Sequence, residues 1–256
     1  MERSIWIGFD PREADAFAVL RHSIRQHALS PIPIRGLVLD HLRRQNLYYR
    51  PTTRNPDGNL WDDISEAPMA TEFSISRFLV PLLVRRSLKT TLVKPHDRWA
   101  VFMDCDMLVT QPMNRLFELA DPSYAVQVVK HYHVPVDHVK MDGQVQTRYQ
   151  RKNWSSVMLF NIDHPAHAAL TVDLVNSVPG RDLHRFFWLR DDEIGELPME
   201  WNYLVGHNSV FELPDSKKPP ANIHFTEGIP TMAGYENCEF ADLWINARNR
   251  WATGSA

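Results

Sequence analysis

Short apolar segments alternate along this chain with segments whose apolar residues recur at helical spacing. The first apolar segment, Ile5–Phe9, ends at Asp10, and a helical pattern follows from Pro11 to Ile24. The next strands are expected at residues 32–39, 99–103, 124–129 and 157–162. Strands that alternate with helices pair mainly in parallel and are covered by helices on both faces. The pattern therefore predicts an α/β fold with a mixed, mostly parallel sheet.

The remaining elements follow from the same periodicities. Helices are expected at residues 11–24, 70–82, 113–119, 166–175, 190–197 and 236–251, and late short strands at residues 210–213 and 223–225. Residues 41–68 are polar, aromatic and rich in turn residues, which is typical of a long surface excursion that either covers a site or is disordered. A polar stretch holds His131, His133 and His138, which either face water or a substrate or form a second metal site.

Composition limits the classes of function that the chain can have. Its 256 residues, 44% of them hydrophobic, can bury a full core as one domain, or as one domain with an appended lobe. The net charge of -3 gives no general attraction to nucleic acid. No apolar stretch is long enough to span a bilayer, and the early strand at Ile5 leaves no room for a signal peptide, so we expect a cytoplasmic protein. With only Cys105 and Cys238, a disulfide framework and a thiolate zinc cluster are excluded.

The apolar segment Trp99–Met103 stops at two carboxylates that are one residue apart, Asp104 and Asp106. Alternate residues of a strand share a face, so both side chains would project toward one spot at the carboxyl end of a buried strand. Two anions held this close repel each other unless a cation, such as a divalent metal ion, lies between them. Because ligands of open α/β sheets bind at this end of the strands, the pair predicts a metal or catalytic site; the alternative is a solvated turn.

Five segments in a fixed order carry a resemblance to a known family. The most specific is Phe102-Met-Asp104-Cys105-Asp106-Met-Leu-Val109 with the helical pattern after it. The others are Ile7-Gly8-Phe9-Asp10, Thr71–Pro81, Arg190–Ile194 with Trp201-Asn202, and Ile223–Thr226. Through these segments the chain resembles the family 8 glycosyltransferases, a group with the GT-A fold that includes glycogenin and the bacterial galactosyltransferases that build lipopolysaccharide.

The resemblance implies a single GT-A domain with a Rossmann-like sheet. Residues 1–110 would form the nucleotide-binding half, residues 111–235 the acceptor side and residues 236–251 a closing helix. The implied activity is metal-dependent transfer of a sugar, with retention of anomeric configuration, from a nucleotide-sugar donor that is UDP-linked. The acceptor would be a saccharide, a glycolipid or a glycoconjugate, and peripheral association with a membrane stays open.

The resemblance also assigns roles to residues. The metal ligands would be Asp104, Asp106 and His224, and the nucleotide contacts Gly8, Asp10, Arg77, Asp104, Cys105 and Asp106. Asp191 and Asp192 would lie beside the reacting sugar carbon, as catalytic carboxylates. Two carboxylates and an imidazole suit Mn²⁺ better than Mg²⁺, although either ion remains open.

Each assignment has a structural alternative. Asp10 can cap the helix after Pro11, Arg77 can pair with Glu72, and His224 can be an ordinary core histidine. Acids such as Asp191 and Asp192 also favour the first turn of a helix.

The chain departs from the family pattern at three places. Asn153-Trp154-Ser155-Ser156 replaces Phe-Asn-Ser/Ala-Gly, Asp192 stands where glutamine is usual, and Gly228–Met232 lacks the family lysine that reaches the diphosphate. A catalytically inactive protein that binds nucleotide sugars therefore stays open. A haloacid-dehalogenase-like phosphatase is a second alternative, since that family also uses Asp-x-Asp after an apolar strand, but it places the motif near its start, whereas two strand-helix units come first here. A nucleotidyltransferase is disfavoured, because no glycine-rich basic loop follows the first strand.

Overall fold

The structure is a computed structural model that describes residues 2–54, 56, 59–87, 97–131, 151 and 153–254. His133 and His138, which the sequence marks as candidate ligands, lie outside these ranges. No helix within the described ranges is long and apolar enough to cross a membrane.

The first half of the chain supplies most of the central sheet. Its elements are β1 (Glu2–Phe9), α1 (Ala14–Gln26), β2 (Ile34–Val38), α2 (Leu39–Arg44), β3 (Thr52–Arg54), β4 (Leu60–Asp62), β5 (Ala67–Pro68), α3 (Val80–Ser87), β6 (Arg98–Met103), β7 (Met107–Val109) and α4 (Met113–Glu118). The second half contains β8 (Val126–Val128), β9 (Val157–Asn161), α5 (Val172–Ser177), α6 (Gly180–His184), β10 (Ile194–Glu196), β11 (Tyr203–Leu204), β12 (Asn222–His224) and α7 (Ala241–Thr253).

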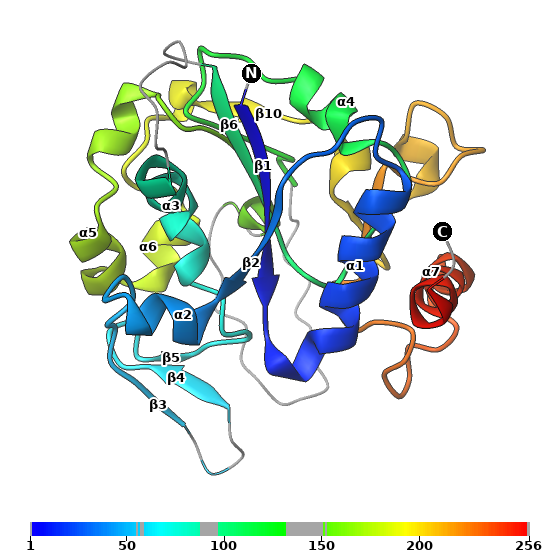
Figure 1. Cartoon of the computed structure of the whole chain (residues 1–256), viewed down its shortest axis with the longest axis horizontal. Coiled ribbons are helices and arrows are strands. Elements are labelled where there is room, and N and C mark those ends of the chain that lie inside the picture. Colours follow the sequence, from blue (N-terminus) through cyan, green and yellow to red (C-terminus); the bar gives the residue numbers. More distant parts are fainter. Residues whose placement is uncertain are drawn as a thin grey trace.

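Six strands form the central sheet, in the order β10-β8-β9-β6-β1-β2. β1 pairs in parallel with β2 and β6, and β8 pairs in parallel with β10, whereas β9 runs antiparallel to both of its neighbours. Helices α1 and α4 lie on one side of this sheet and α3, α5 and α6 on the other (Figure 1). The predicted α/β architecture with a mixed, mostly parallel sheet is confirmed.

The apolar run before the two acids becomes the central strand β6. Trp99 to Met103 are all buried, which is expected for a strand that is covered on both faces. Helix α1 packs between this sheet and the closing helix α7, where Ala16 and Val19 meet Trp244. This packing leaves the carboxyl ends of β1 and β6 next to each other, at one edge of the core.

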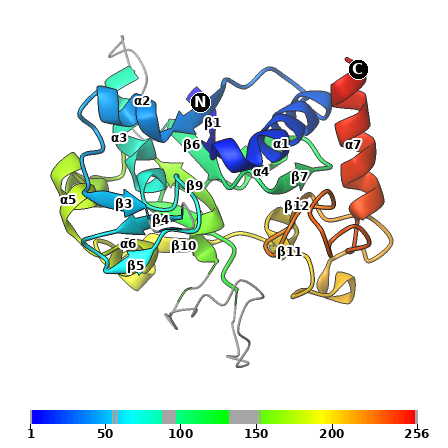
Figure 2. The same ribbon diagram turned by 90° about the horizontal axis from the view of Figure 1, so that it is seen from below.

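A second sheet, β11-β12-β7, continues from the first through a bend at Cys105 and Asp106. β12 runs antiparallel to β7, with His224 opposite Met107, and the Phe225 N–H donates to the Asp106 carbonyl at 2.9 Å. This pairing joins two segments that are far apart in the sequence. It brings His224 next to the two acids. Strand β12 lies on the opposite side of the molecule from the small sheet β3-β4-β5 (Figure 2).

The predicted excursion at residues 41–68 is an ordered unit over most of its length. It contains part of α2 and the antiparallel sheet β3-β4-β5. The Arg50 side chain, which is buried with Asp62, ties this unit to α5 by donating to the carbonyls of Val175 and Val178 at 2.9 and 2.7 Å. The alternative of a disordered loop is therefore wrong for the described part.

Five local predictions are wrong in type or boundary. The helix expected at residues 166–175 is a 3₁₀ turn, Pro165–Ala168, followed by the separate short helix α5. Residues 190–197 form a 3₁₀ turn and strand β10, not the expected helix. The strand packs closely against the Tyr124 ring, which is possible because residue 195 is glycine: a Cβ there would lie 2.5 Å from that ring. Residues 210–212 form a 3₁₀ turn, not a strand. Helix α3 begins at Val80, because Pro81 is tolerated only in the first turn. Helix α7 begins at Ala241, because Phe240 has a left-handed φ of 62°.

Candidate metal and nucleotide site

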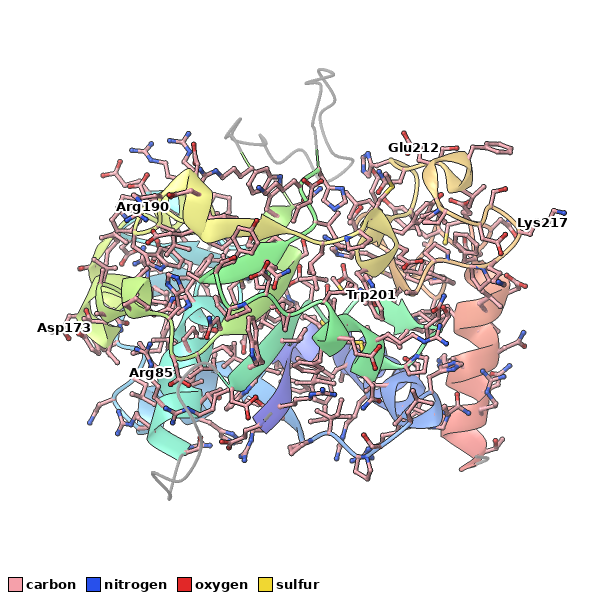
Figure 3. The ribbon with its side chains drawn as sticks, turned by 90° about the horizontal axis from the view of Figure 1, so that it is seen from above. Arg85, Asp173, Arg190, Trp201, Glu212 and Lys217 are labelled. Atoms are coloured by element: carbon pink, nitrogen blue, oxygen red, sulfur yellow. The ribbon has the colours of Figure 1, made fainter. Side chains whose placement is uncertain are left out.

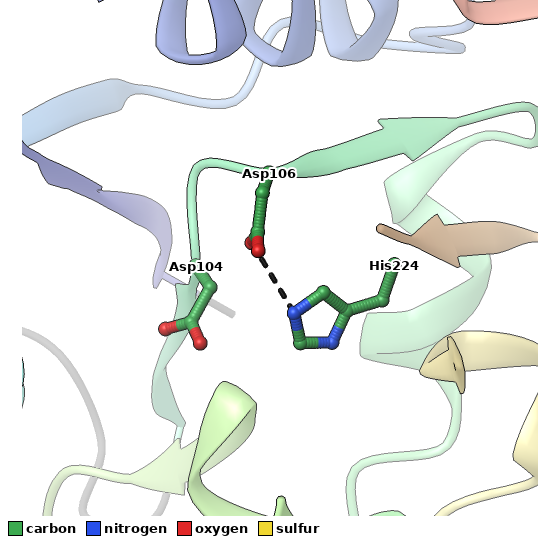
Figure 4. A group of neighbouring side chains, drawn as sticks. All are labelled: Asp104, Asp106 and His224. Carbon is green, nitrogen blue, oxygen red and sulfur yellow. Dashed lines mark ion pairs between the residues drawn. The ribbon is translucent and has the colours of Figure 1, made fainter. Parts of the chain in front are cut away.

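Asp104, Asp106 and His224 come together where β6, β7 and β12 meet (Figure 4). One ligand atom from each residue lies within 4.8 Å of the other two. Nε2 of His224 lies 3.2 Å from Oδ1 of Asp106. The bend after β6 turns both carboxylates toward the imidazole, so the structure brings the three predicted ligands together.

Arg77 holds Asp104 in place. Its Nη1 lies 2.8 Å from Oδ1 of Asp104 and donates to the Ser155 carbonyl at 2.9 Å. The guanidinium carbon lies 5.4 Å from the ring centre of Phe73 and 4.9 Å from that of Phe102, and the residue is 6% exposed. The alternative pairing with Glu72 is not what the structure shows, because Glu72 pairs with Arg54. Arg77 is thus a cation fixed in place by its surroundings, and its ion-pair partner is Asp104.

The charges of this group are not balanced. Burial raises the pKa of Asp104 to about 6, since the opposing effect of Arg77 is offset in part by the neighbouring Asp106. Burial alone would lower the pKa of His224, but the carboxylates of Asp106 and Asp104 outweigh it and raise that pKa. Asp104 and His224 therefore hold their protons more strongly than the same side chains do in water, as expected where neighbouring acids lack a compensating metal ion.

The donor atoms fit a divalent cation. Oδ1 of Asp104 and Oδ1 of Asp106 are both buried, and neither receives a well-directed hydrogen bond from any residue that the structure describes, although each lies within ion-pair distance of a cationic group. These oxygens keep lone pairs that a metal ion can use. Two carboxylates and one imidazole are a ligand set that suits Mn²⁺ and similar ions.

Glu13 is a further acid at this place, and it was not predicted from the sequence. Its Oε2 accepts a hydrogen bond from the Cys105 Sγ–H, with 2.9 Å between the two atoms. Burial, followed by the charge of Asp106, raises the pKa of Glu13 to about 7. Burial also raises the pKa of the Cys105 thiol, which stays protonated and acts here as a hydrogen-bond donor.

Asp10 has the surroundings of a structural cap. Its Oδ1 accepts from the backbone N–H and Nε of Arg12 at 2.9 and 3.0 Å, and its Oδ2 accepts from Nη2 of Arg12 and the Glu72 N–H at 2.8 and 3.1 Å. Burial would raise the pKa of Asp10, but these hydrogen bonds outweigh it and lower that pKa. Its carboxylate therefore fastens the turn after β1 to residues 71–72, and a nucleotide contact by Asp10 stays a prediction.

Packing against Phe73 explains why glycine occupies position 8. A Cβ at this position would lie 2.4 Å from ring atoms of Phe73, so only glycine lets that ring reach Arg77 and β6. A contact between Gly8 and a nucleotide stays a prediction, as it does for Cys105.

Asp191 and Asp192 lie at the surface. Asp191 is 89% exposed at its side chain and pairs with Arg151, and Asp192 is 72% exposed and pairs with Arg190 at 3.0 Å. Figure 3 shows Arg190 at the periphery of the molecule. Both acids are on a 3₁₀ turn before β10 and not on the expected helix. Their catalytic role stays a prediction.

The segment Asn153–Ser156, which departs from the family pattern, borders the metal ligands. The Asp104 N–H donates to the Ser156 carbonyl at 3.0 Å, next to the contact between Arg77 and the Ser155 carbonyl. Trp154 carries Nζ of Lys130 and the guanidinium carbon of Arg151 over its ring, at 5.8 and 5.5 Å.

The chain is similar in sequence to a curated protein. No protein-family model matches the chain. The curated relative Protein CDI of Arabidopsis thaliana is 41% identical over 242 residues, which is 94% of this chain and 84% of the relative.

Solved structures of low sequence identity share the fold. The bifunctional glycosyltransferase WbbM aligns with a TM-score of 0.60 and 19% identity over 96% of this chain, which spans only 49% of WbbM. The galactosyltransferase LgtC, solved in complex with donor and acceptor sugar analogues, aligns with a TM-score of 0.58 and 13% identity over 96% of this chain and 95% of LgtC. GlyE of Streptococcus pneumoniae TIGR4, a glycosyltransferase, aligns with a TM-score of 0.57 and 12% identity over 98% of this chain and 62% of GlyE. The chain therefore has the GT-A-type glycosyltransferase fold.

Proposed function

Since the chain belongs to the family of Protein CDI from Arabidopsis thaliana and has the GT-A-type fold, we propose that it is a metal-dependent glycosyltransferase. The observation that carries the proposal is the group Asp104, Asp106 and His224, with its excess of acidic charge at the carboxyl end of β6. The donor that we propose is a nucleotide sugar, because its diphosphate is the ligand that a cation in this group would hold. That the nucleotide is UDP rests on the family resemblance.

In this proposal each residue of the group has a defined task. Asp104, Asp106 and His224 hold the cation, which supplies positive charge to the diphosphate as negative charge develops on the leaving nucleotide. Arg77 keeps Asp104 in its ligating position and lowers the repulsion between the two acids. The backbone carbonyl of Ser155 accepts from Arg77, and that of Ser156 accepts from the Asp104 N–H, so this segment supports both Arg77 and Asp104.

The finer parts of the proposal rest on the resemblance. We propose transfer with retention of anomeric configuration, with Asp191 or Asp192 beside the reacting carbon, and Mn²⁺ in preference to Mg²⁺. The acceptor is a saccharide, a glycolipid or a glycoconjugate. A cytoplasmic location and peripheral membrane association stay predictions.

The experiment is a turnover assay on the purified protein with a panel of nucleotide sugars and Mn²⁺. Release of nucleoside diphosphate is followed with and without simple sugar acceptors. The wild type should release the nucleotide only when the metal is present, and Asp106→Asn should abolish this release. Asp15→Asn, which makes the same chemical change at an exposed ion pair with Arg248, should leave it unchanged.

Other outcomes identify the alternative functions. Release of phosphate from p-nitrophenyl phosphate, without turnover of any nucleotide sugar, would indicate a phosphatase. Metal-dependent nucleotide binding without turnover would indicate an inactive binding protein. The absence of both turnover and metal-dependent nucleotide binding would refute the proposed site.

A further inference from the structure

The imidazole of His224 is held on the side that faces away from the two acids. Its Nε2 points to Asp106, and the other ring nitrogen points away from it (Figure 4). This second nitrogen, Nδ1, lies 2.9 Å from Oδ1 of Asn202. Asn202 is completely buried, so water does not compete for this hydrogen bond.

The surroundings of Asn202 determine which way its amide faces. Its Nδ2 lies 3.1 Å from Nε2 of His131 and 3.2 Å from the Asn153 carbonyl oxygen. The carbonyl is a pure acceptor, so it requires the NH₂ end of the amide to lie there. The amide oxygen is then left to face His224. An acceptor in that position requires that Nδ1 of His224 carries a hydrogen, so the lone pair that the neutral ring offers to a cation is the one on Nε2.

The backbone around Asn202 is also fixed. Asn202 directly follows a 3₁₀ turn, Met199–Trp201, and precedes β11, which pairs with β12. The side chain of Asn222, on β12, donates to the Trp201 carbonyl at 2.9 Å. Trp201 lies in the interior of the molecule (Figure 3). The amide of Asn202 is thus presented to His224 by the same sheet that carries the histidine.

We propose that Asn202 is a positioning residue of the metal site, and that His131 and Asn153 set its orientation. Asn202 accepts from Nδ1–H of His224 and so selects the tautomer whose Nε2 can ligate the ion. His131 contributes through an unprotonated Nε2 that accepts from Asn202. This inference rests on the proposed function, because it requires that a divalent cation binds at Asp104, Asp106 and His224.

The test is the affinity of the purified protein for the metal alone, measured by electron paramagnetic resonance of free Mn²⁺, with Mg²⁺ measured by competition. Asn202→Leu removes the acceptor at similar volume, and Mn²⁺ affinity should fall by about tenfold to a hundredfold, as for other residues that orient metal ligands. Mg²⁺ relies less on imidazole, so its affinity should fall by a smaller factor. A merely structural loss would weaken both ions equally, and equal losses would overturn the inference.

A pair of variants at His131 tests the second part. His131→Gln keeps a neutral acceptor for the Asn202 amide and should bind Mn²⁺ nearly as the wild type does. His131→Leu lacks the acceptor and should bind it several times more weakly. Equal affinities of these two variants would overturn the role of His131.

The outcomes separate this inference from the proposed function. If the wild type binds Mn²⁺ and Asp106→Asn does not, the metal site stands; wild-type affinity in Asn202→Leu would then refute the positioning role alone. If the wild type binds no Mn²⁺, both are refuted. Far-ultraviolet circular dichroism and thermal unfolding of each variant confirm that only folded protein is compared.

Discussion

Two buried charged clusters of this molecule differ in how well their charges are matched. In the first, Arg50 donates from Nε and Nη2 to the two carboxylate oxygens of Asp62 at 2.7 and 2.6 Å, and both side chains are almost fully buried. Burial would raise the pKa of Asp62, but the hydrogen bonds from Arg50 and Ser65 outweigh it and lower that pKa. This cluster is complete without any ligand.

In the second cluster the acids outnumber their cationic partners. Arg77 compensates Asp104, while Asp106 and Glu13 add further negative charge, and the pKa values of Asp104 and Glu13 are raised to about 6 and about 7. A fold keeps such a cluster when the missing charge arrives with a ligand. The difference indicates that the first cluster stabilises the fold, and it supports the proposal that the second binds a cation.

The largest expected effect is on the complete cluster. Asp62→Asn leaves the Arg50 guanidinium buried without its anion, so the free energy of unfolding should fall by about 3–5 kcal/mol. Denaturant unfolding measures this loss. The remaining folded protein should bind Mn²⁺ as the wild type does. A loss below about 1 kcal/mol, as expected for an exposed pair such as Asp15 with Arg248, would show that this cluster is not structural.

The incomplete cluster should respond in the opposite way. Asp106→Asn removes one of the repelling charges, so the metal-free protein should be as stable as the wild type or slightly more stable. Mn²⁺ affinity should fall by more than about a hundredfold, because a ligand is lost. Calorimetric titration and thermal unfolding measure both quantities. If Asp106→Asn is less stable than the wild type in the absence of metal, yet still binds Mn²⁺, then this cluster stabilises the fold and does not bind the ion.

The pH dependence of stability should also distinguish the clusters. Asp104, Glu13 and His224 have raised pKa values, so the folded metal-free protein binds more protons than the unfolded chain. Their contribution to stability is therefore greatest at low pH and is lost as pH rises, between about 4 and about 7 for Asp104 and Glu13, and above the ordinary histidine pKa of 6.5 for His224. Asp62, with its lowered pKa, behaves in the opposite way: its contribution to stability is present above its ordinary pKa of 3.8 and is lost as pH falls below that value.

Because a metal must displace the bound protons, Mn²⁺ should raise the melting temperature more at about pH 8 than at about pH 6. Asp15→Asn should show the same difference, and Asp106→Asn should show none. A metal effect that is independent of pH would contradict the assignment of these groups.

The smallest expected effect is at Glu13. Glu13→Gln keeps an acceptor for the Cys105 thiol but removes a charge that acts on the ion from outside the ligand group. We expect Mn²⁺ affinity to fall by less than about tenfold, since such an interaction is on the order of 1 kcal/mol. The decrease in stability between about pH 4 and about pH 7 should become shallower. A loss as large as that of Asp106→Asn would show that Glu13 is itself a ligand.

The sequence predicted the part of the site that local periodicity controls. The apolar run of β6 ending at Asp104 and Asp106 was sufficient to place two carboxylates at the end of a buried strand. His224 came only from the family resemblance, because its position depends on the pairing of β7 with β12, which no local pattern reveals. Glu13 was missed, although an acid just after β1 lies at the strand end next to β6 in the sheet.

Other predictions failed where tertiary contacts override local preference. Asp191 and Asp192 have the composition of a helix start, yet pairing of Ile194 with Val126 draws the following residues into the sheet. The nucleotide contact assigned to Asp10 stays a prediction. Four hydrogen bonds occupy its carboxylate, and the one from Glu72, far along the chain, is a tertiary contact that no local pattern reveals.

The most direct measurement is anomalous diffraction from crystals grown with Mn²⁺ and uridine diphosphate. We predict an anomalous peak at ligating distance from Asp104, Asp106 and Nε2 of His224, with the diphosphate on its open side. A manganese peak elsewhere, or a diphosphate bound away from these three residues, would contradict it.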